Sequence, residues 1–379
     1  MNFSLTKQQL LFQQMIREFA EKEVKPLAAE VDEQERFPME TVEKMAKIGI
    51  MGIPIPTQYG GAGGSNLLYS IAVEELSAAC ATTGVIVSAH TSLCAAPILE
   101  HGTEAQKQKY LPKLASGEWI GAFGLTEPNA GTDASAQQTT AVLDGDNYVI
   151  NGSKIFITNA QYAHVYVIFA MTDKSLGVKG ITAFIVEKGT PGFSIGKKEK
   201  KMGIRGSATC ELIFENCIIP KENLLGKVNG GFAIAMKTLD GGRVGIASQA
   251  LGIAQGAMDE TVKYIKERKQ FGKSIAQFQN TAFQMADLET RVEAARMLVR
   301  SAAFKKDSGE SYSVAAAMAK LYAAETAMEV TNKAIQFHGG YGYTREYPVE
   351  RMMRDAKITE IYEGTSEVQR MVISASLFK

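Results

Sequence analysis

The chain has 379 residues, of which 45% are hydrophobic and 22% are charged, and its 41 basic residues balance 41 acidic ones. A globular chain of this length is too long for one hydrophobic core, so two or three packed units are expected. The balanced charge gives no electrostatic reason to expect nucleic acid or an anionic membrane as a partner.

The cysteines and the first residues indicate where the protein works. The four cysteines have no CxxC or metal-ligand spacing, and they are interpreted as buried free thiols in a reducing compartment. Residues 1–6 lack the charged region and apolar run of a signal peptide, and no stretch approaches a membrane span. The protein is therefore predicted to be cytoplasmic, and no metal site is predicted.

Residues 1–118 are predicted to form a helical domain. Thr6 and Gln9 make a capping-box pattern at the start of the first helix, which Pro26 should bend or interrupt. The glycine-rich run at 59–64 lacks the lysine of a P-loop and the strand-before-helix context of a dinucleotide site, and it is predicted to be a loop. Further helices are expected over 39–48, 67–80, 84–101 and 104–116.

Residues 119–226 show short apolar or alternating runs separated by Gly, Asp and Asn turns. No helical pattern long enough for a parallel crossover lies between the runs, which predicts an antiparallel barrel or sandwich. The predicted strands include 141–143, 148–150, 154–157, 165–169, 180–186 and 211–214.

Residues 227–379 are predicted to be helical again after a glycine-rich joint. Apolar residues such as Leu288, Val292, Ala295 and Leu298 recur every three or four positions, which is the pattern of a helix bundle. The same faces fit a subunit interface or a monomeric core equally well. The fold class is thus α+β and multidomain, ending in a four-helix bundle. The helices are expected over 231–268, 275–306, 313–337, 349–355 and 366–377.

Glu363 is the candidate catalytic residue because of its place before the last helix. Apolar Ile361 and Tyr362 precede it, and Gly364 after it gives another molecule close access to the backbone. Burial would raise the basicity of such a carboxylate, which suits a general base. A solvated loop glutamate fits the same pattern. Glu367, inside the first helical turn, fits a carboxylate stabilised by the helix dipole.

Four separated segments, together with Glu363, carry a resemblance to a known family. They are Leu125 to Asp133, Asn151 to Asn159, Arg268 to Gly272 and Gln336 to Tyr343. In this order they resemble the acyl-CoA dehydrogenases, and the match runs from the first helix to the last residues.

The resemblance implies an activity and a base. Members of the family bind FAD and remove a hydrogen pair from the α and β carbons of an acyl-CoA thioester. Glu363 would take the α proton, its backbone N–H and a flavin ribityl hydroxyl would hold the thioester carbonyl, and hydride would pass to the flavin N5. Some relatives carry the base at the position of Gly242, which cannot take a proton.

The resemblance also implies how the cofactor is held. Thr126 would meet the pyrimidine edge, Thr158 would lie near N5, and Phe156 would face the ring. Arg268 would grip the pyrophosphate across a subunit interface. Without the resemblance, 156–158 would be interpreted as a buried strand. The implied FAD-binding residues are Phe123, Leu125, Thr126, Phe156, Thr158, Arg268, Phe271, Gln279, Gln336, Gly339, Gly340, Thr365 and Glu367.

The substrate positions point to a short acyl chain. Gln249 and Thr359 match positions that narrow the acyl pocket in short-chain members, and a polar amide there would be left unpaired by a long alkyl chain. Butyryl-CoA is the expected substrate, with propionyl, branched or substituted acyl groups as alternatives. The implied substrate-binding residues are Thr132, Asp240, Arg243, Gln249, Thr359 and Gly364.

Three functions stay open at this point. The first is a homotetrameric short-chain acyl-CoA dehydrogenase, a dimer of dimers, that exchanges electrons with an electron-transferring flavoprotein and can run in reverse as an enoyl-CoA reductase. The second is an oxidase that reduces oxygen. The third is a non-catalytic flavin-binding scaffold, against which the intact Glu363 argues.

Overall fold

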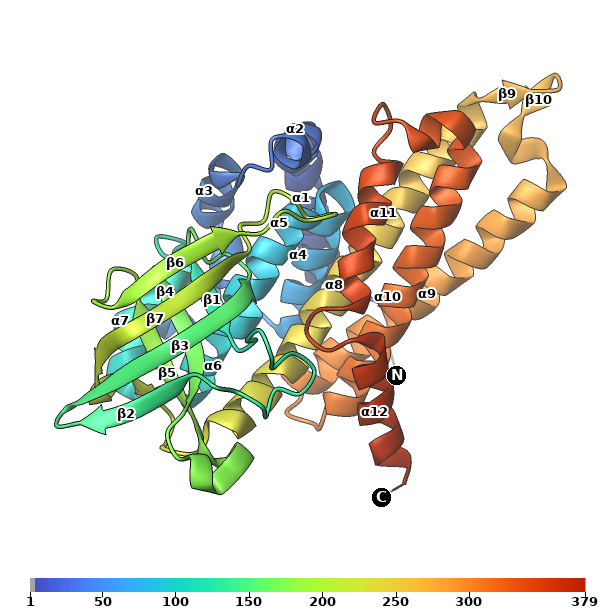
Figure 1. Ribbon diagram of the computed structural model, residues 1–379. Helices are drawn as coiled ribbons and strands as arrows, with labels where there is room; N and C mark the ends of the chain where they lie inside the picture. The colour runs from blue at the N-terminus through green and yellow to red at the C-terminus, as the bar shows by residue number, and fades with distance from the viewer. Residues whose placement is uncertain (1–3, 379) are drawn as a thin grey trace.

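The computed structural model describes residues 4–378, which form N-terminal helices, a sheet built from the middle of the chain and a group of long C-terminal helices (Figure 1). The capping box at Thr6 is present, with the Thr6 side chain accepting from the Gln9 N–H. Pro26 lies in a 3₁₀ turn that interrupts the first helical run, as predicted. The N-terminal helices are α1 (Lys7–Phe19), α2 (Ala28–Glu33), α3 (Met39–Lys47), α4 (Asn66–Ala79), α5 (Ala81–Ser88), α6 (Ala96–His101) and α7 (Glu104–Ala115). Between α1 and α2 lie the π turn η1 (Ala20–Val24) and the 3₁₀ turn η2 (Lys25–Leu27), and later turns are η3 (Ile50–Gly52), η4 (Thr57–Tyr59) and η5 (Ala89–Ala95).

The run Ala81–His101 is long and apolar enough to cross a membrane by length and composition, but 89% of its apolar window is buried inside the protein. From the sequence, no stretch of this kind is expected. Burial on this scale is the mark of a core helix, which must be apolar on every side.

The middle of the chain forms one eight-stranded sheet. Its order is β6-β7-β3-β2-β4-β5-β8, with β1 paired to β4. Most pairs are antiparallel as predicted, but β1 and β4 are parallel, and β2 meets β4 in parallel at Thr140 and Met171. The prediction of an antiparallel sheet was wrong for these pairs. The chain passes from β1 to the parallel strand β4 through the β2–β3 hairpin, so no helix is needed to connect them. The strands are β1 (Gly121–Gly124), β2 (Thr140–Asp144), β3 (Asn147–Ile157), β4 (Val165–Met171), β5 (Ile181–Glu187), β6 (Phe193–Lys198), β7 (Cys210–Pro220) and β8 (Leu224–Leu225).

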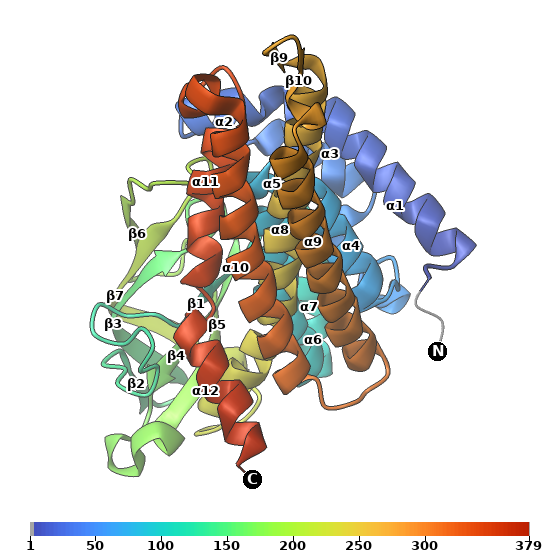
Figure 2. The ribbon, with the colours of Figure 1, turned by 90° about the vertical axis from the view of Figure 1, so that its right-hand side faces the viewer.

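The C-terminal helices lie side by side, with α11 and α12 following one another along α10 (Figure 2). Their shared core includes Leu288, Val292 and Ala295 from the predicted apolar face. The helices are α8 (Gly231–Glu267), α9 (Gln279–Asp307), α10 (Ser313–His338), α11 (Val349–Lys357) and α12 (Ser366–Leu377). The short hairpin β9 (Lys269–Gln270) and β10 (Lys273–Ser274) and the 3₁₀ turns η8 (Ile275–Gln277), η9 (Gly339–Tyr343) and η10 (Ile358–Glu360) connect them.

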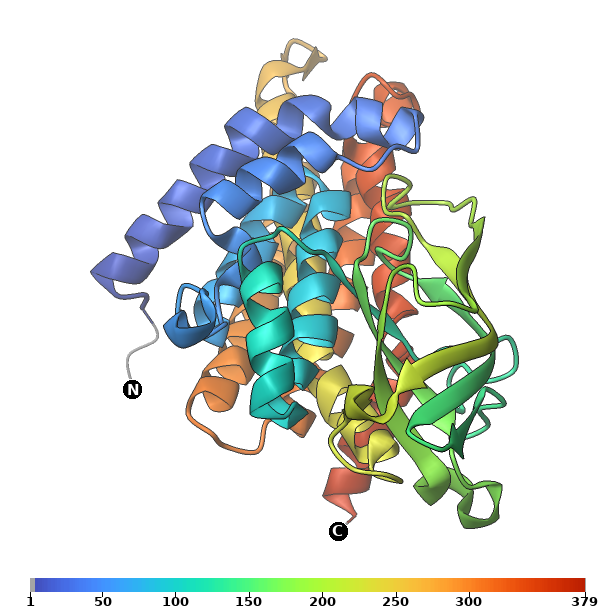
Figure 3. The same cartoon turned by 90° about the vertical axis from the view of Figure 1, so that its left-hand side faces the viewer.

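The N-terminal helices and the sheet both lie against the long C-terminal helices (Figure 3). Helix α4 packs on α8 at two glycines. A Cβ atom at Gly252 would lie 2.2 Å from the Glu74 carbonyl oxygen, and one at Gly256 would lie 2.3 Å from that of Ala78. The two backbones can approach this closely only because neither position carries a side chain.

Candidate active site

Glu363 lies in a tight turn between η10 and α12. Its φ is 53° and that of Gly364 is 94°, and a positive φ is rare for a residue with a side chain. The turn directs the carboxylate toward α8, where a Cβ atom on Gly242 would lie 2.0 Å from Glu363 Oε2. This Oε2 atom is buried and has no hydrogen-bond partner among the described residues. A buried, unsatisfied acceptor indicates a place where another molecule binds.

The surroundings of Glu363 change its acidity. Burial raises its pKa to about 8, against the opposing charges of Lys320 and Arg243. A carboxyl group with such a pKa exchanges its proton near neutral pH. This value suits a base that removes a proton from carbon.

Asp240 and Arg243 lie one turn apart on α8, beside the acid. Arg243 donates to Asp240 Oδ1 at 2.7 Å, and Ser313 donates to the same oxygen at 2.9 Å. Arg243 is buried, and its Nε has no partner among residues 4–378. Arg243 and Glu363 thus each present a buried polar atom that the protein leaves unsatisfied.

The residues predicted to shape the acyl pocket are buried, and the protein itself satisfies their polar groups. The Gln249 amide donates to the Ala81 carbonyl at 3.0 Å and accepts a hydrogen bond from the Tyr362 hydroxyl. The Thr359 hydroxyl donates to the Ala356 carbonyl at 2.7 Å. The amide of Gln249 therefore has hydrogen-bond partners for both its N–H donor and its oxygen. It is locked in place by a tyrosine next to the acid.

Phe156 stands out on strand β3. It is 60% exposed and has a φ of 59°, an outlier for a bulky residue. Between Lys154 and Ile157 the strand has one residue more than its partner β7, which makes a β-bulge. The bulge turns the aromatic ring out of the sheet. The prediction of a buried strand from the residues alone was wrong at this position.

The other predicted flavin residues of the middle domain lie close to this bulge. The Thr126 carbonyl accepts from the Ile155 N–H at 2.9 Å, which joins the segment after β1 to β3. Lys154 is fully buried, and its ammonium donates to Glu127 at 2.6 Å and to the Leu125 carbonyl at 3.3 Å. Phe123, Thr126 and Thr158 are partly exposed, Leu125 is buried, and Thr132 is exposed on the loop that follows.

A cavity of about 720 Å³ lies at the end of the bundle that carries β9 and β10. Arg268, Gln336, Gly339 and Gly340 line it, and a Cβ at either glycine would meet nothing within 4 Å. Phe271, in the turn of the hairpin, is 93% exposed. Gln279 begins α9 and is exposed. An open cavity that offers free backbone at two glycines and a guanidinium, which lies over the Tyr341 ring 5.7 Å from its centroid, suits a nucleotide phosphate.

These residues do not form one site within a single chain. The hairpin with its cavity and the segment between α11 and α12 lie apart along the bundle (Figures 1 and 2). Thr365 caps α12, where its hydroxyl accepts from the Val368 N–H at 3.3 Å, and Glu367 is exposed in the first turn. Hydrogen bonds from the Glu367 backbone N–H and from the Thr365 side chain lower the pKa of the Glu367 carboxyl group.

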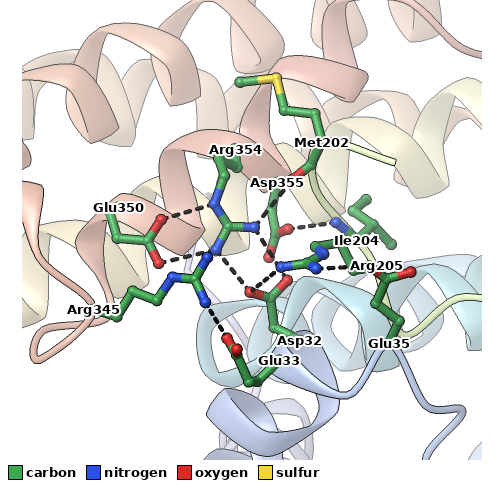
Figure 4. A network of polar contacts seen from close by, with 10 residues as sticks. All are labelled: Asp32, Glu33, Glu35, Met202, Ile204, Arg205, Arg345, Glu350, Arg354 and Asp355. Atoms are coloured by element: carbon green, nitrogen blue, oxygen red, sulfur yellow. Dashed lines mark hydrogen bonds and ion pairs between the residues drawn. The ribbon is translucent and has the colours of Figure 1, made fainter. Parts of the chain in front are cut away.

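A network of charges holds α11, the helix that leads to Glu363 (Figure 4). Arg354 on α11 forms an ion pair with Asp32 on α2 at 2.7 Å and donates to the Met202 carbonyl at 3.0 Å. Asp355 accepts from the Ile204 N–H at 2.5 Å. Since the loop after β6 carries Met202 and Ile204, this network ties all three parts of the chain together.

The outer members of the network extend the same contacts. Arg205 forms an ion pair with Glu35 at 2.6 Å, Glu350 pairs with Arg354 at 2.7 Å, and Arg345 pairs with Glu33 (Figure 4). Each pair except that of Glu350 joins two different parts of the chain. The network is therefore an interdomain contact that sets the position of α11.

Sequence reasoning missed three residues that contact the acid or its neighbours. They are Lys320, Gln369 and Tyr362. A signal for Lys320 was present, because it falls on the apolar face of α10 at the spacing of Ala316, Ala323 and Ala327, which are all buried. A lysine on such a face needs a partner or a function. Gln369 and Tyr362 gave no comparable signal.

Three family models match the chain in order. They are described as the N-terminal, middle and C-terminal domains of acyl-CoA dehydrogenase, and they match residues 6–118, 122–217 and 229–378. The short-chain specific acyl-CoA dehydrogenase of Clostridium acetobutylicum is 67% identical over 379 residues, which cover 100% of both chains.

Two solved structures are similar over the whole chain. Butyryl-CoA dehydrogenase from Megasphaera elsdenii matches with a TM-score of 0.98 and 52% identity, covering 100% of both chains. The second structure is described as the electron transferring flavoprotein of Acidaminococcus fermentans, in work on a mechanism of flavin-based electron bifurcation. One of its chains matches with a TM-score of 0.99 and 59% identity, again over 100% of both chains.

Proposed function

Because the chain belongs to the acyl-CoA dehydrogenase family of FAD-dependent oxidoreductases, we propose that it dehydrogenates a short-chain acyl-CoA, with butyryl-CoA as substrate and Glu363 as base. The observation that carries this proposal is the buried, unsatisfied Oε2 of Glu363. It faces a space on α8 that Gly242 leaves open.

Glu363 removes the α proton of the thioester in this proposal. Its pKa of about 8 makes it a far stronger base than an exposed glutamate, and burial keeps water from competing for the proton. The α proton is a weak acid, so charge on the developing enolate must be stabilised at the same time. The Glu363 backbone N–H donates to the thioester oxygen, and the left-handed turn at Glu363 and Gly364 fixes where it points.

The residues present fit FAD in two groups. Phe156, turned outward by the bulge, offers a ring face, and Thr126 and Thr158 beside it offer polar groups for a flavin edge. Arg268, Gln336, Gly339 and Gly340 line a cavity suited to the pyrophosphate and adenosine. When bound, FAD supplies the acceptor for the β hydride. Since the two groups lie apart in one chain, each FAD is held by two subunits, which requires at least a dimer; the proposed assembly is a homotetramer built as a dimer of dimers.

The locked amide of Gln249 limits the length of the acyl chain. Gln249 is fully buried and held from both sides by Ala81 and Tyr362. A longer acyl chain would have to displace the amide and leave its donor and acceptor unsatisfied, which costs about 1–3 kcal/mol for each group. A four-carbon chain avoids this cost.

The electron partner in this proposal is an electron-transferring flavoprotein. Support comes from the electron-transferring flavoprotein structure that contains a chain 59% identical to this one over its full length. In this proposal the same site catalyses both the oxidation of the acyl-CoA and the reduction of the enoyl-CoA. The cytoplasmic location stays a prediction.

An anaerobic titration tests the proposal. Purified protein with its bound flavin is mixed with acyl-CoAs of four, six, eight and sixteen carbons while the flavin absorbance is recorded. Rapid bleaching by butyryl-CoA and little by the sixteen-carbon thioester are expected. Bleaching that increases with chain length would refute the short-chain assignment, and no bleaching by any thioester would refute the activity.

A further inference from the structure

The turn that carries Glu363 is held by two buried side chains at one carbonyl oxygen. We propose that Lys320 and Gln369 are positioning residues that fix the Glu363–Gly364 turn through the Gly364 carbonyl, with Lys320 also setting the basicity of Glu363. This inference rests on the proposed role of Glu363 as base.

Both donors reach the same atom. Lys320 Nζ on α10 donates to the Gly364 carbonyl at 2.7 Å, and Gln369 Nε2 on α12 donates to it at 2.7 Å. Gln369 also donates to the Glu363 carbonyl at 3.5 Å. Lys320 and Gln369 are both 0% exposed. A carbonyl oxygen has two acceptor sites, so the protein uses both to hold the residue next to the acid.

The turn needs such support because its backbone is strained. Glu363 has a φ of 53°, and a residue with a side chain keeps that conformation only where its surroundings enforce it. A Cβ atom at Gly364 would lie 2.7 Å from Gln369 Nε2, so only glycine allows this donor to come so close. The glycine noted in the sequence as giving access to the backbone gives that access to Gln369.

Lys320 has no carboxylate within ion-pair distance among residues 4–378, although it is fully buried. Burial lowers the pKa of Lys320 to about 8, against the attraction of Glu363, Glu360 and Glu367. The groups that act on Glu363 from neighbouring elements are Lys320 on α10 and Arg243 on α8, and Tyr69 on α4 also faces it. Of these two cations, Lys320 lowers the pKa of Glu363 more than Arg243 does.

The two donors therefore have different effects. Both hold the carbonyl, but only Lys320 brings a charge that favours the ionised form of Glu363. Loss of Gln369 misplaces the acid without changing its charge environment. Loss of Lys320 misplaces the acid and also makes it harder to ionise.

The test compares pH profiles of kcat/KM for butyryl-CoA with an artificial electron acceptor. Lys320→Met should lower kcat/KM at pH 7 at least tenfold and move the acidic limb of the profile up by about one pH unit. Gln369→Leu should lower kcat about tenfold while the limb stays at the wild-type pH. Both variants should keep their bound flavin.

Arg370→Met is the matched control. Arg370 on α12 pairs with Glu325 on α10, so this pair also joins the two helices, but both side chains are about half exposed. Among residues 4–378, neither side chain forms a hydrogen bond or ion pair with the Glu363–Gly364 turn. The control should match the wild type in rate and in pH profile. Should Lys320→Met lose its flavin, Lys320→Gln, which removes the charge but keeps an N–H donor, should show the same shift of the limb.

The outcomes separate this inference from the proposed function. If Glu363→Gln is inactive while the Lys320 and Gln369 variants behave like Arg370→Met, the inference is wrong and the proposed base stands. If Glu363→Gln retains its activity, the proposed function itself is wrong. An unshifted limb in both Lys320 variants would overturn the electrostatic part, and a normal kcat in Gln369→Leu would overturn the positioning part.

Discussion

A Cβ atom on Gly242 would lie 2.0 Å from Oε2 of Glu363, so a side chain at position 242 would force the Glu363 carboxylate out of its present place. Some members of the family place their base at the position of Gly242. The geometry explains how a base at either position could serve the same site, because a side chain at position 242 and the Glu363 carboxylate reach the same space.

The shared space leads to the first prediction. Gly242→Ala should force the Glu363 carboxylate out of its place and lower kcat by about 10²-fold, since a small misplacement of a catalytic group costs this much. Gly241→Ala is the control, because its Cβ would meet only the flexible end of Lys306 at 3.0 Å and Tyr312 at 3.7 Å. Steady-state rates with butyryl-CoA distinguish the two. Equal rates for both variants would contradict the assignment.

The second prediction concerns pH. Burial raises the pKa of Glu363 to about 8, so below that pH the free enzyme holds a protonated acid that cannot accept a proton. The value of kcat/KM should therefore fall about tenfold for each pH unit below about 8. Glu363→Gln should keep its flavin, lose turnover by about 10³-fold and lose this limb. A flat profile between pH 6 and 8 in the wild type would count against Glu363 as base.

The third prediction concerns the length of the acyl chain. Gln249→Ala removes the amide that Tyr362 and Ala81 hold, and it leaves room for further methylenes. Each buried methylene contributes about 0.8 kcal/mol, so the preference for hexanoyl-CoA over butyryl-CoA should rise by roughly tenfold. Tyr362→Phe should give a smaller change in the same direction. The ratio of kcat/KM for hexanoyl-CoA to that for butyryl-CoA measures this preference. An unchanged ratio in Gln249→Ala would show that Gln249 does not limit the length of the acyl chain.

The fourth prediction concerns stability at the interdomain network. Burial raises the pKa of Asp355 to about 6, so the folded protein binds this proton more tightly than the unfolded chain. Ionised Asp355 therefore destabilises the fold above pH 6, and the penalty disappears as the pH falls toward 4. Asp355→Asn, whose amide oxygen can still accept from the Ile204 N–H, should be more stable than the wild type by about 3 kcal/mol at pH 8 and close to it near pH 4. Thermal melts at both pH values measure this, with exposed Asp144→Asn as a control that should change neither.

The long helices could be predicted from the sequence because apolar residues recur at the helical period over many turns. Helix α10, expected over 313–337, runs Ser313–His338, and α12, expected over 366–377, runs Ser366–Leu377. Short elements such as β1 and the β9–β10 hairpin carry too few residues to show a period, and they were not predicted. The pairing of β1 with β4 depends in addition on contacts that are distant in the sequence.

The site was predictable only as a set of positions. Glu363 was found from its neighbours and the resemblance, but its closeness to Gly242 depends on how α8 packs against the last turn. The same holds for the hydrogen bond from Tyr362 to Gln249 and for Lys320 at the Gly364 carbonyl. Periodicity assigns a residue to the face of a helix, but it does not give the neighbour on another helix.

The ion pair of Asp32 with Arg354 has a consequence for truncated versions of the protein. If the first 35 residues were deleted, Arg354 would lose its partner on α2 but keep Glu350 on its own helix, and the helix that leads to Glu363 would lose its ion pair to the N-terminal helices. A protein without these residues should therefore be less active than the full chain although Glu363 and the other predicted site residues are intact, and adding residues 4–35 back as a separate peptide should restore the position of α11.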